Sequence, residues 1–175
     1  MEFKDFNVYF CSSPNYDQAC AEIKCEGEGI TLIALCGEYN ADIKKSTFPT
    51  VFVRESERAK FCRFLMSLRE ESFLSLDLDE VKFIFQNGRI GSFYCSEGTD
   101  LKDVTRTLTE QISNKPCSNP RVLLSVRMPE SSALNDIEYV VEELNSCLQT
   151  EDFIFCAGFE DADTISLGCV VFSAE

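Results

Sequence analysis

The chain has 175 residues, of which 45% are hydrophobic and 26% charged, a composition ordinary for one compact domain or two small lobes. Its net charge of −14 lies mostly in residues 71–175, which hold nineteen acidic and seven basic residues, against eleven and nine in residues 1–70. Because so acidic a surface would repel a phosphate backbone, we expect no nucleic-acid partner, and we attribute the acidity to solubility.

No stretch of the sequence predicts a membrane segment or an export signal. The apolar runs are far shorter than the ~20 residues that a membrane helix needs, and no apolar stretch follows a basic segment at the N-terminus. We therefore expect a chain without a membrane span, located in the cytoplasm.

Ten cysteines are present, most of them inside apolar runs such as YFC, IALC, FIFC and GCVVF, where cysteine behaves as a small buried hydrophobe. The sequence has no C-x-x-C pair and no histidine, which excludes zinc sites of the usual spacing, so we expect no metal. Reduced core thiols are therefore predicted. The alternative is a disulfide or a reactive thiol, for which Cys20 and Cys25 on a helix face are the candidates.

The first 70 residues predict a small lobe of βαβ type. The expected strands are FNVYFC, ITLIALC and PTVFV, and the expected helices are DQACAEIKC and residues 54–70. The unbroken aliphatic run of ITLIALC, residues 30–36, is typical of a strand buried on both faces, and βαβ units form parallel sheets. On the second helix we expect a broad apolar face of Ala59, Cys62, Leu65 and Met66, with Phe61 and Leu68 beside them.

An acidic turn opens the second half of the chain. Asp77, Asp79 and Glu80 lead into the short apolar run VKFIF, and Asn87-Gly88 is a strong turn dipeptide before the extended segment RIGSFYC. This order predicts a short helix over residues 79–86 that turns sharply into a strand.

Two amphipathic helices alternate with strands in the remainder of the chain. Helix 99–113 has Asp100 and Asp103 near its start, where they favour the helix dipole, and its apolar stripe is Leu101, Val104, Leu108 and Ile112. Helix 134–148 has an acidic outer face, expected to face solvent or, alternatively, a partner, and its stripe is Leu134, Ile137, Val141, Leu144 and Leu148. Strands are expected at 121–128, 152–159 and 164–174.

The segment SLDLDEVK, from Ser75 to Lys82, resembles the loop N-L-D-F-x-D-V-K of the FtsZ branch of the FtsZ/tubulin superfamily. From residue 74 to 174, the order of elements is similar to that of the family's C-terminal half, and ACAEIKCEGEGITLIALC more loosely resembles A-E-I-A-K-x-x-G-x-L-T-V-A-V-V. The resemblance implies an α/β (α+β) fold with a mixed β-sheet and amphipathic helices. Its expected domains are a reduced βαβ lobe at 1–70 and an FtsZ-like C-terminal domain at 71–175.

In that superfamily a glycine-rich loop, G-G-G-T-G-T/S-G, cradles the phosphates of GTP, because amides without side chains can approach the anion closely. This chain has eight glycines and no such run, and SSPNYDQ stands where the loop would fall. No other glycine motif for phosphate occurs. We therefore expect no GTP binding by this chain alone, no cofactor and no enzymatic activity, so that the fold is that of a degenerate GTPase.

The acidic loop is the family feature that this chain keeps. In family filaments it reaches the nucleotide of the next subunit and helps to position the attacking water, and Asp77 and Glu80 match its two acids. The chain departs from the pattern at Ser75, at Asp79, which adds a charge, and at Glu80, where the family has aspartate. Two interpretations stay open: the acids dock on the nucleotide face of a filament protein, or they only start a helix, with Asp77 as its cap.

Other candidate sites are weaker. Glu160, Asp161 and Asp163 could bind calcium, but their spacing is not that of an EF-hand and a solvated turn is the simpler interpretation. The serine pairs at 12–13 and 131–132 have no histidine to activate them.

The favoured function is a non-enzymatic FtsZ-like interaction or assembly module, related to cell division. Its protein partner is expected to be a second copy or an FtsZ-like filament-forming GTPase. The alternative is a small-ligand-binding or enzymatic domain, whose site would lie in the cleft between the two lobes, where strand ends and helix N-termini converge.

Overall fold

The computed structural model describes residues 2–3, 5–12, 21, 23, 29–37, 48–70, 73–85, 90–114, 120–150, 152–160 and 163–173. Its strands are β1 (Glu2–Phe3), β2 (Phe6–Ser12), β3 (Ile30–Cys36), β4 (Thr50–Val53), β5 (Ile90–Gly98), β6 (Arg121–Pro129), β7 (Asp152–Glu160) and β8 (Ile165–Phe172). Its helical segments are the 3-10 turn η2 (Glu55–Glu57) and the helices α2 (Arg58–Ser67), α3 (Leu78–Phe85), α4 (Leu101–Ser113) and α5 (Leu134–Leu148). Most of the predicted helix DQACAEIKC lies outside the described residues.

The strands form one mixed sheet in the order β1-β2-β3-β4-β5-β8-β6-β7. Neighbours from β2 to β5 are parallel, β8 lies antiparallel between β5 and β6, and β7 is parallel to β6. The predicted mixed α/β sheet is thus confirmed. Because Thr50, Val51 and Phe52 of β4 pair with the start of β5, the sheet continues from the first half of the chain into the second. The division into domains at residues 70 and 71 stays a prediction.

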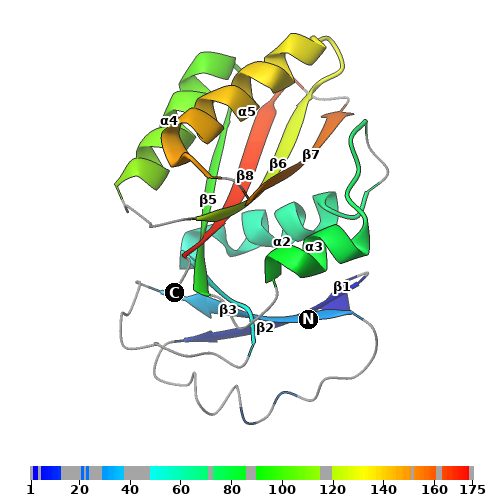
Figure 1. Ribbon diagram of the computed structural model, residues 1–175, viewed down its shortest axis with the longest axis vertical. Coiled ribbons are helices and arrows are strands. Elements are labelled where there is room, and N and C mark those ends of the chain that lie inside the picture. The colour runs from blue at the N-terminus through cyan, green and yellow to red at the C-terminus, as the bar shows by residue number, and fades with distance from the viewer. Residues whose placement is uncertain are drawn as a thin grey trace.

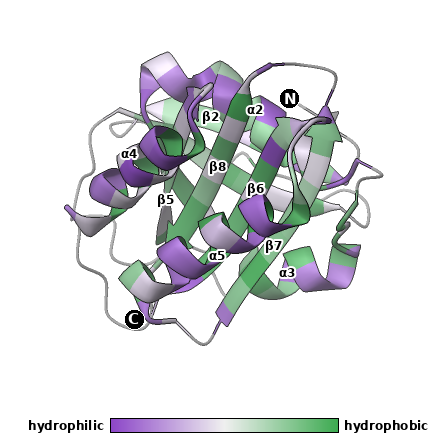
Figure 2. Cartoon of the chain, turned by 90° about the horizontal axis from the view of Figure 1, so that it is seen from above, coloured by the Kyte–Doolittle hydropathy of each residue, from purple (hydrophilic) through white to green (hydrophobic). Residues whose placement is uncertain are grey.

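Helices cover both faces of the part of the sheet formed by β5, β8, β6 and β7. The helices α4 and α5 lie on one face, and α2 and α3 lie on the other, between these strands and β1–β3 (Figure 1). Seen from the α4 and α5 side, the strands are hydrophobic while the helices carry hydrophilic outer surfaces (Figure 2). None of the described helices is long and apolar enough to cross a membrane.

Aromatic rings join the two halves of the chain around α2 and α3. The Phe85 ring of α3 lies 6.3 Å from Phe6 of β2 and 5.2 Å from Phe172 of β8, measured between centroids. On α2, the Phe61 ring lies 5.1 Å from Phe93 of β5. Edge-to-face contacts at these distances add to the free energy gained by burial. The core is therefore shared between the halves rather than divided between them.

Polar side chains define where two helices begin. The Asp100 carboxylate accepts a hydrogen bond from the Asp103 amide at 2.9 Å and caps the first turn of α4, which begins two residues later than predicted. Before α5, the Ala133 amide donates to the Asp136 carboxylate at 2.8 Å. The helix α5 ends at Gln149, whose φ of 49° lies in the left-handed region that terminates helices.

The predicted apolar stripes are correct for α4 and partly wrong for α2 and α5. On α2, Ala59 and Met66 are exposed and Cys62 is half-buried, while the buried face is Phe61, Phe64, Leu65, Ser67 and Leu68. The physical reason is that α2 packs between two parts of the sheet, which selects the phenylalanine side of the helix. On α5, Val140 is buried in place of Val141, and Leu134 is 54% exposed. The helix α3 begins one residue earlier than predicted, at Leu78.

Candidate functional site

A row of polar side chains crosses the sheet face that meets α2. On β6, Val122, Leu124 and Val126 point to α4 and α5, whereas Ser125 and Arg127 point to α2. The strand register places Glu97 of β5 beside Ser166 of β8, and Ser166 beside Arg127. Because β5, β6 and β7 are parallel, their carboxyl ends meet at one edge of the sheet. The polar row therefore lies at the end of three strands.

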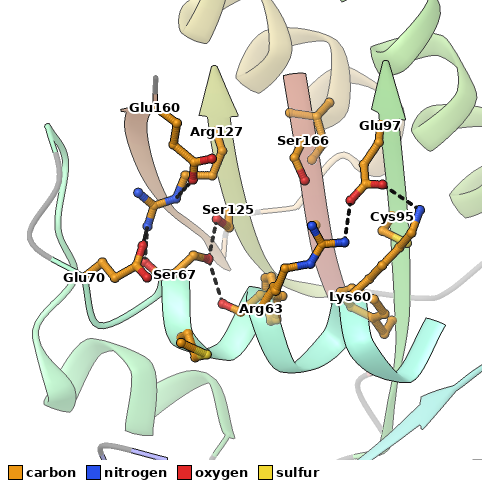
Figure 3. A pocket seen from close by; sticks show the side chains of 15 residues that line it. Lys60, Arg63, Ser67, Glu70, Cys95, Glu97, Ser125, Arg127, Glu160 and Ser166 are labelled. Atoms are coloured by element: carbon orange, nitrogen blue, oxygen red, sulfur yellow. Dashed lines mark hydrogen bonds and ion pairs between the residues drawn. The ribbon is translucent and has the colours of Figure 1, made fainter. Parts of the chain in front are cut away.

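The helix α2 presents a matching polar stripe to this row. Lys60, Arg63, Ser67 and Glu70 follow one another at three- and four-residue spacing, so they share one face of the helix and its C-terminal extension. Between the stripe and the sheet lies a cavity of about 160 Å³ (Figure 3). We call this cavity the α2 cleft, and its polar lining is Lys60, Arg63, Ser67, Glu70, Glu97, Ser125, Arg127, Glu160 and Ser166.

One end of the α2 cleft carries an excess of positive charge. The Lys60 ammonium lies 2.9 Å from one oxygen of the Glu97 carboxylate, and the Arg63 guanidinium lies 3.1 Å from the other. Two cations thus share a single carboxylate. The hydrogen bond to Glu97 raises the pKa of the Lys60 ammonium above its ordinary value, so this group stays charged at neutral pH.

The other end carries an excess of negative charge. Arg127 Nη2 lies 3.1 Å from the Glu70 carboxylate, and Arg127 Nε lies 3.8 Å from that of Glu160. The Arg127 side chain is only 9% exposed, whereas both glutamates are about half exposed. The buried Nε has no hydrogen-bond partner among the described residues. The Arg127 guanidinium thus pairs with two carboxylates, while its Nε hydrogen is not donated in a hydrogen bond to a described residue.

Hydroxyl groups lie between the two charged ends. The Ser67 and Ser125 hydroxyls are 2.7 Å apart, and the Ser67 hydroxyl also donates to the Phe64 carbonyl at 2.7 Å. Arg127 Nη2 donates to the Ser67 carbonyl at 2.6 Å, so this network ties the end of α2 to β6. The middle of the cleft therefore offers polar groups on a fixed frame.

The α2 cleft is lined by charged groups and hydroxyls, and its one thiol is not activated. Burial raises the pKa of the Cys95 thiol, which lines the cleft, to about 11, so it is protonated at neutral pH. The described part of the chain contains no group of three or more His, Cys, Asp or Glu side chains that could hold a metal ion. Of the seven described cysteines, Cys95, Cys156 and Cys169 are buried as predicted for core thiols, and the other four are half-buried. Cys20 and Cys25 lie outside the described residues.

The acidic loop forms a reciprocal cap at the start of α3. The Asp77 carboxylate accepts a hydrogen bond from the Glu80 amide at 2.8 Å, and the Glu80 carboxylate accepts one from the Asp77 amide at 2.9 Å. This is the capping-box arrangement, which satisfies two otherwise free amides of a helix start. Asp77, Asp79 and Glu80 are all exposed. The loop is thus a helix cap, and its carboxylates also face solvent.

The other predicted sites divide between the described and the undescribed residues. Glu160 ends β7 and pairs with Arg127, Asp163 is exposed, and Asp161 lies outside the described residues. Ser132 belongs to the turn after β6, where its amide donates to the Pro129 carbonyl at 2.9 Å. Neither feature brings together a catalytic or metal-binding set in the part of the chain that the structure describes.

The polar lining of the α2 cleft was missed by the sequence analysis, which placed the alternative site in a cleft without naming its residues. Two signals were available in the sequence. One is the S-V-R segment from Ser125 to Arg127, in which polar side chains interrupt a strand at alternate positions. The other is the stripe Lys60, Arg63, Ser67 and Glu70 on a helix whose opposite side is apolar.

The fold is that of the FtsZ/tubulin proteins. Three solved structures match nearly the whole chain: an FtsZ dimer of M. jannaschii (TM-score 0.66, 12% identity), protofilaments of TubZ in GDP form from Bacillus thuringiensis serovar israelensis (0.59, 8%) and CetZ from Methanosaeta thermophila (0.64, 10%). They cover 97% to 98% of this chain, and the chain covers 63%, 61% and 61% of theirs. The likeness confirms the predicted FtsZ/tubulin-like fold.

The comparisons that rest on sequence gave no match. No protein-family model matches the chain, and no curated protein matches it. At 8% to 12% identity, the solved structures speak for the fold alone.

Proposed function

We propose that this chain is a non-enzymatic FtsZ-like interaction module that associates with a second copy or with an FtsZ-like filament protein through its acidic loop. The observation that carries the proposal is the exposure of Asp77, Asp79 and Glu80 on this fold. Two structures that share the fold are described as assemblies, one as an FtsZ dimer and one as TubZ protofilaments.

Capping leaves the loop free to act on a partner. Asp77 uses one carboxylate oxygen for the Glu80 amide, and Glu80 uses one for the Asp77 amide. Neither of the remaining oxygens has a hydrogen-bond partner among the described residues. The cap also fixes both side chains, which lowers the conformational entropy lost on association. The surface that fits this loop is cationic, either basic side chains or the metal–nucleotide face of a filament GTPase.

The test separates the charge of the loop from its capping role. Asn is as good a helix cap as Asp, and Gln can replace Glu in the capping box, so Asp77→Asn with Asp79→Asn and Glu80→Gln removes the charge and keeps the helix. Sedimentation velocity over a range of concentrations measures self-association, and co-sedimentation with a filament-forming FtsZ-like GTPase measures the second partner. We expect the charge-free variant to lose association while keeping its thermal stability.

The α2 cleft supports a second function, the binding of a small molecule. The favouring observation is a cavity whose charged groups form two ends of opposite sign around a hydroxyl pair. A thermal-shift screen with nucleotides and metabolites tests it, because a ligand present at about 100 times its Kd adds about 2.7 kcal/mol to the free energy of unfolding. For GTP with magnesium, calorimetry is expected to detect no binding.

A further inference from the structure

The arrangement of charge in the α2 cleft specifies the kind of molecule that fits it. The end at Lys60 and Arg63 has one more cation than anion, and the end at Glu70 and Glu160 has one more anion than cation. A ligand with a single charge would satisfy one end and leave the other as it is. A ligand with an anionic and a cationic group would engage both.

We propose that the α2 cleft binds a small linear zwitterion, with its carboxylate at Lys60 and Arg63 and its ammonium at Glu70 and Glu160. This inference rests on the second function proposed above and names its ligand class. The exposed donors of Lys60 and Arg63 can reach an incoming carboxylate while they keep Glu97, because an ammonium has three donors and a guanidinium five. Glu70 and Glu160 are half exposed, so their free oxygens can receive an ammonium.

The spacing of the strands sets the length of the ligand. Glu97 and Arg127 lie on β5 and β6, which are separated by β8 and lie in register through Ser166. Adjacent strands are about 4.8 Å apart, so the backbones of β5 and β6, which carry one residue of each end, are about 10 Å apart. We take this spacing as the length that the ligand must span. An α-amino acid is too short for this span. An unbranched ω-amino acid or a tripeptide with free termini, at about 3.5 Å per extended residue, has the required length.

The size and the lining of the cleft favour the slimmer of these molecules. A cavity of about 160 Å³ is smaller than the ~300 Å³ at which drug-sized pockets begin, so a chain without side branches fits best. Phe64 and Phe93 line the cleft beside the charged groups and can contact the methylene groups of such a chain. The Ser67 and Ser125 hydroxyls lie between the ends, where a peptide amide would find partners.

The close packing next to the cleft shows that the cavity is not a gap left by loose contact. A Cβ atom added at Gly168 of β8 would lie 2.8 Å from Cδ2 of Phe64 on α2, so helix and strand touch there. The cleft is therefore a preformed cavity with a tightly packed wall.

The experiment titrates the full chain with small charged probes, and calorimetry and amide chemical shifts measure the binding. The probes are aminobutanoic, aminohexanoic and aminooctanoic acids with the amine at the chain end, and triglycine. The controls are octanoate and octylamine, which carry one charge each. We expect millimolar affinity, strongest for the probes that span both ends and reduced by salt, because the contacts are partly exposed ion pairs. Comparing the affinity of triglycine with that of the aminoalkanoic acids shows whether the cleft prefers a peptide or an aliphatic chain.

A change of specificity distinguishes the proposal from a merely structural effect. Glu70→Lys gives the negative end an excess positive charge, so this variant should lose the zwitterion and bind octanedioate, a dicarboxylate of similar length. The matched control is Glu142→Lys, the same charge change at an exposed site on α5, which should leave the preference unchanged. Arg63→Gln should weaken zwitterion binding at least about threefold.

The outcomes test two claims separately: that the cleft binds a small molecule, and that this molecule is a zwitterion. Binding of the zwitterions with the Glu70→Lys switch supports the ligand class. Equal binding of octanoate or octylamine, or an unchanged preference in Glu70→Lys, overturns it while leaving ligand binding by the cleft in place. No binding of any probe at about 10 mM overturns the ligand class, and a negative metabolite screen then overturns the second function as well.

Discussion

The two faces of the strands β5, β8, β6 and β7 are built from alternate residues of the same segments, yet they differ in character. Toward α4 and α5 the face is formed almost wholly by apolar side chains, among them Leu124, Val126, Leu167 and Ala157. Toward α2 it is apolar where the phenylalanines pack and polar at the strand ends, where Ser125, Arg127 and Glu97 lie.

This difference indicates that the two faces of one strand serve different ends, one the stability of the fold and the other its function. The buried polar groups of the α2 face, among them Ser125 and Arg127, are costly to bury, and hydrophobic residues of similar volume often fill such positions without loss of stability. The α4 and α5 face shows that the sequence can supply such residues. The polar end of the α2 face is therefore the part of the sheet that a function best explains.

The largest expected loss of stability comes from a substitution in the apolar face. Leu124→Ala removes a fully buried side chain beneath α4 and α5 and should lower the free energy of unfolding by about 2–5 kcal/mol, measured by urea denaturation. The neighbouring Ser125→Ala removes one partner of the hydroxyl pair on the opposite face and should cost only about 1 kcal/mol. Equal losses in the two variants would contradict the assigned roles of the faces.

Two glycines allow the faces to be compared through packing. Gly168→Ala places a Cβ 2.8 Å from Phe64 of α2, and Gly98→Ala places one 2.9 Å from Cγ2 of Val104 on α4. Each should cost about 1–3 kcal/mol in stability. Because Phe64 also lines the α2 cleft, only Gly168→Ala should alter ligand binding there, and the added change Phe64→Leu should restore stability by relieving the contact. Altered binding in Gly98→Ala would argue against this separation.

Two thiols on neighbouring strands give a test that depends on pH. Burial raises the pKa of the Cys95 thiol, on the α2 face, to about 11 and also raises that of Cys169, on the α4 face. Above pH 9 the unfolded chain releases these protons while the native chain keeps them, so stability should be full below pH 9 and fall as pH rises toward 11. Cys95→Ala should make the loss smaller by about 1 kcal/mol at pH 10, measured against wild type by urea denaturation. A stability that rises over this range would contradict the buried thiols.

The smallest expected loss of stability comes from the start of α3, which lies on the same side of the sheet as α2 (Figure 1). Asp77→Ala removes the helix cap and should cost about 1 kcal/mol, whereas Asp77→Asn should cost far less. Thermal unfolding of the two variants measures the difference. If Asp77→Ala weakens the helix and neither variant changes partner binding, then the loop acts only as a cap.

The sequence predicts the elements of this molecule well where periodicity and turn chemistry agree. Helix α5 and strand β3 have the predicted bounds, and Asp100 and Asp103 lie at the start of α4 as expected. Burial was predicted less well on α2, because a helix covered on more than one side does not reveal its buried face by counting apolar residues. Phe64 rather than Met66 is buried because the contacts of α2 come from strands distant in the sequence.

The α2 cleft could not be predicted from local patterns for a related reason. Its polar groups come from α2, β5, β6, β7 and β8, and only the strand order brings them together. Arg127 and Glu70 are separated by more than fifty positions, so no motif records their contact. The acidic loop, in contrast, is a single segment, and both its resemblance and its capping chemistry are visible in the sequence.

The most direct test of the proposed function is sedimentation velocity of the wild-type chain and of the charge-free variant Asp77→Asn, Asp79→Asn, Glu80→Gln, alone and with an FtsZ-like filament protein. We predict that the wild-type chain associates with itself or with the filament protein and that the variant, equally stable, does not. A wild-type chain that stays monomeric and unbound at every concentration, or a variant that associates as strongly as wild type, would contradict the proposal.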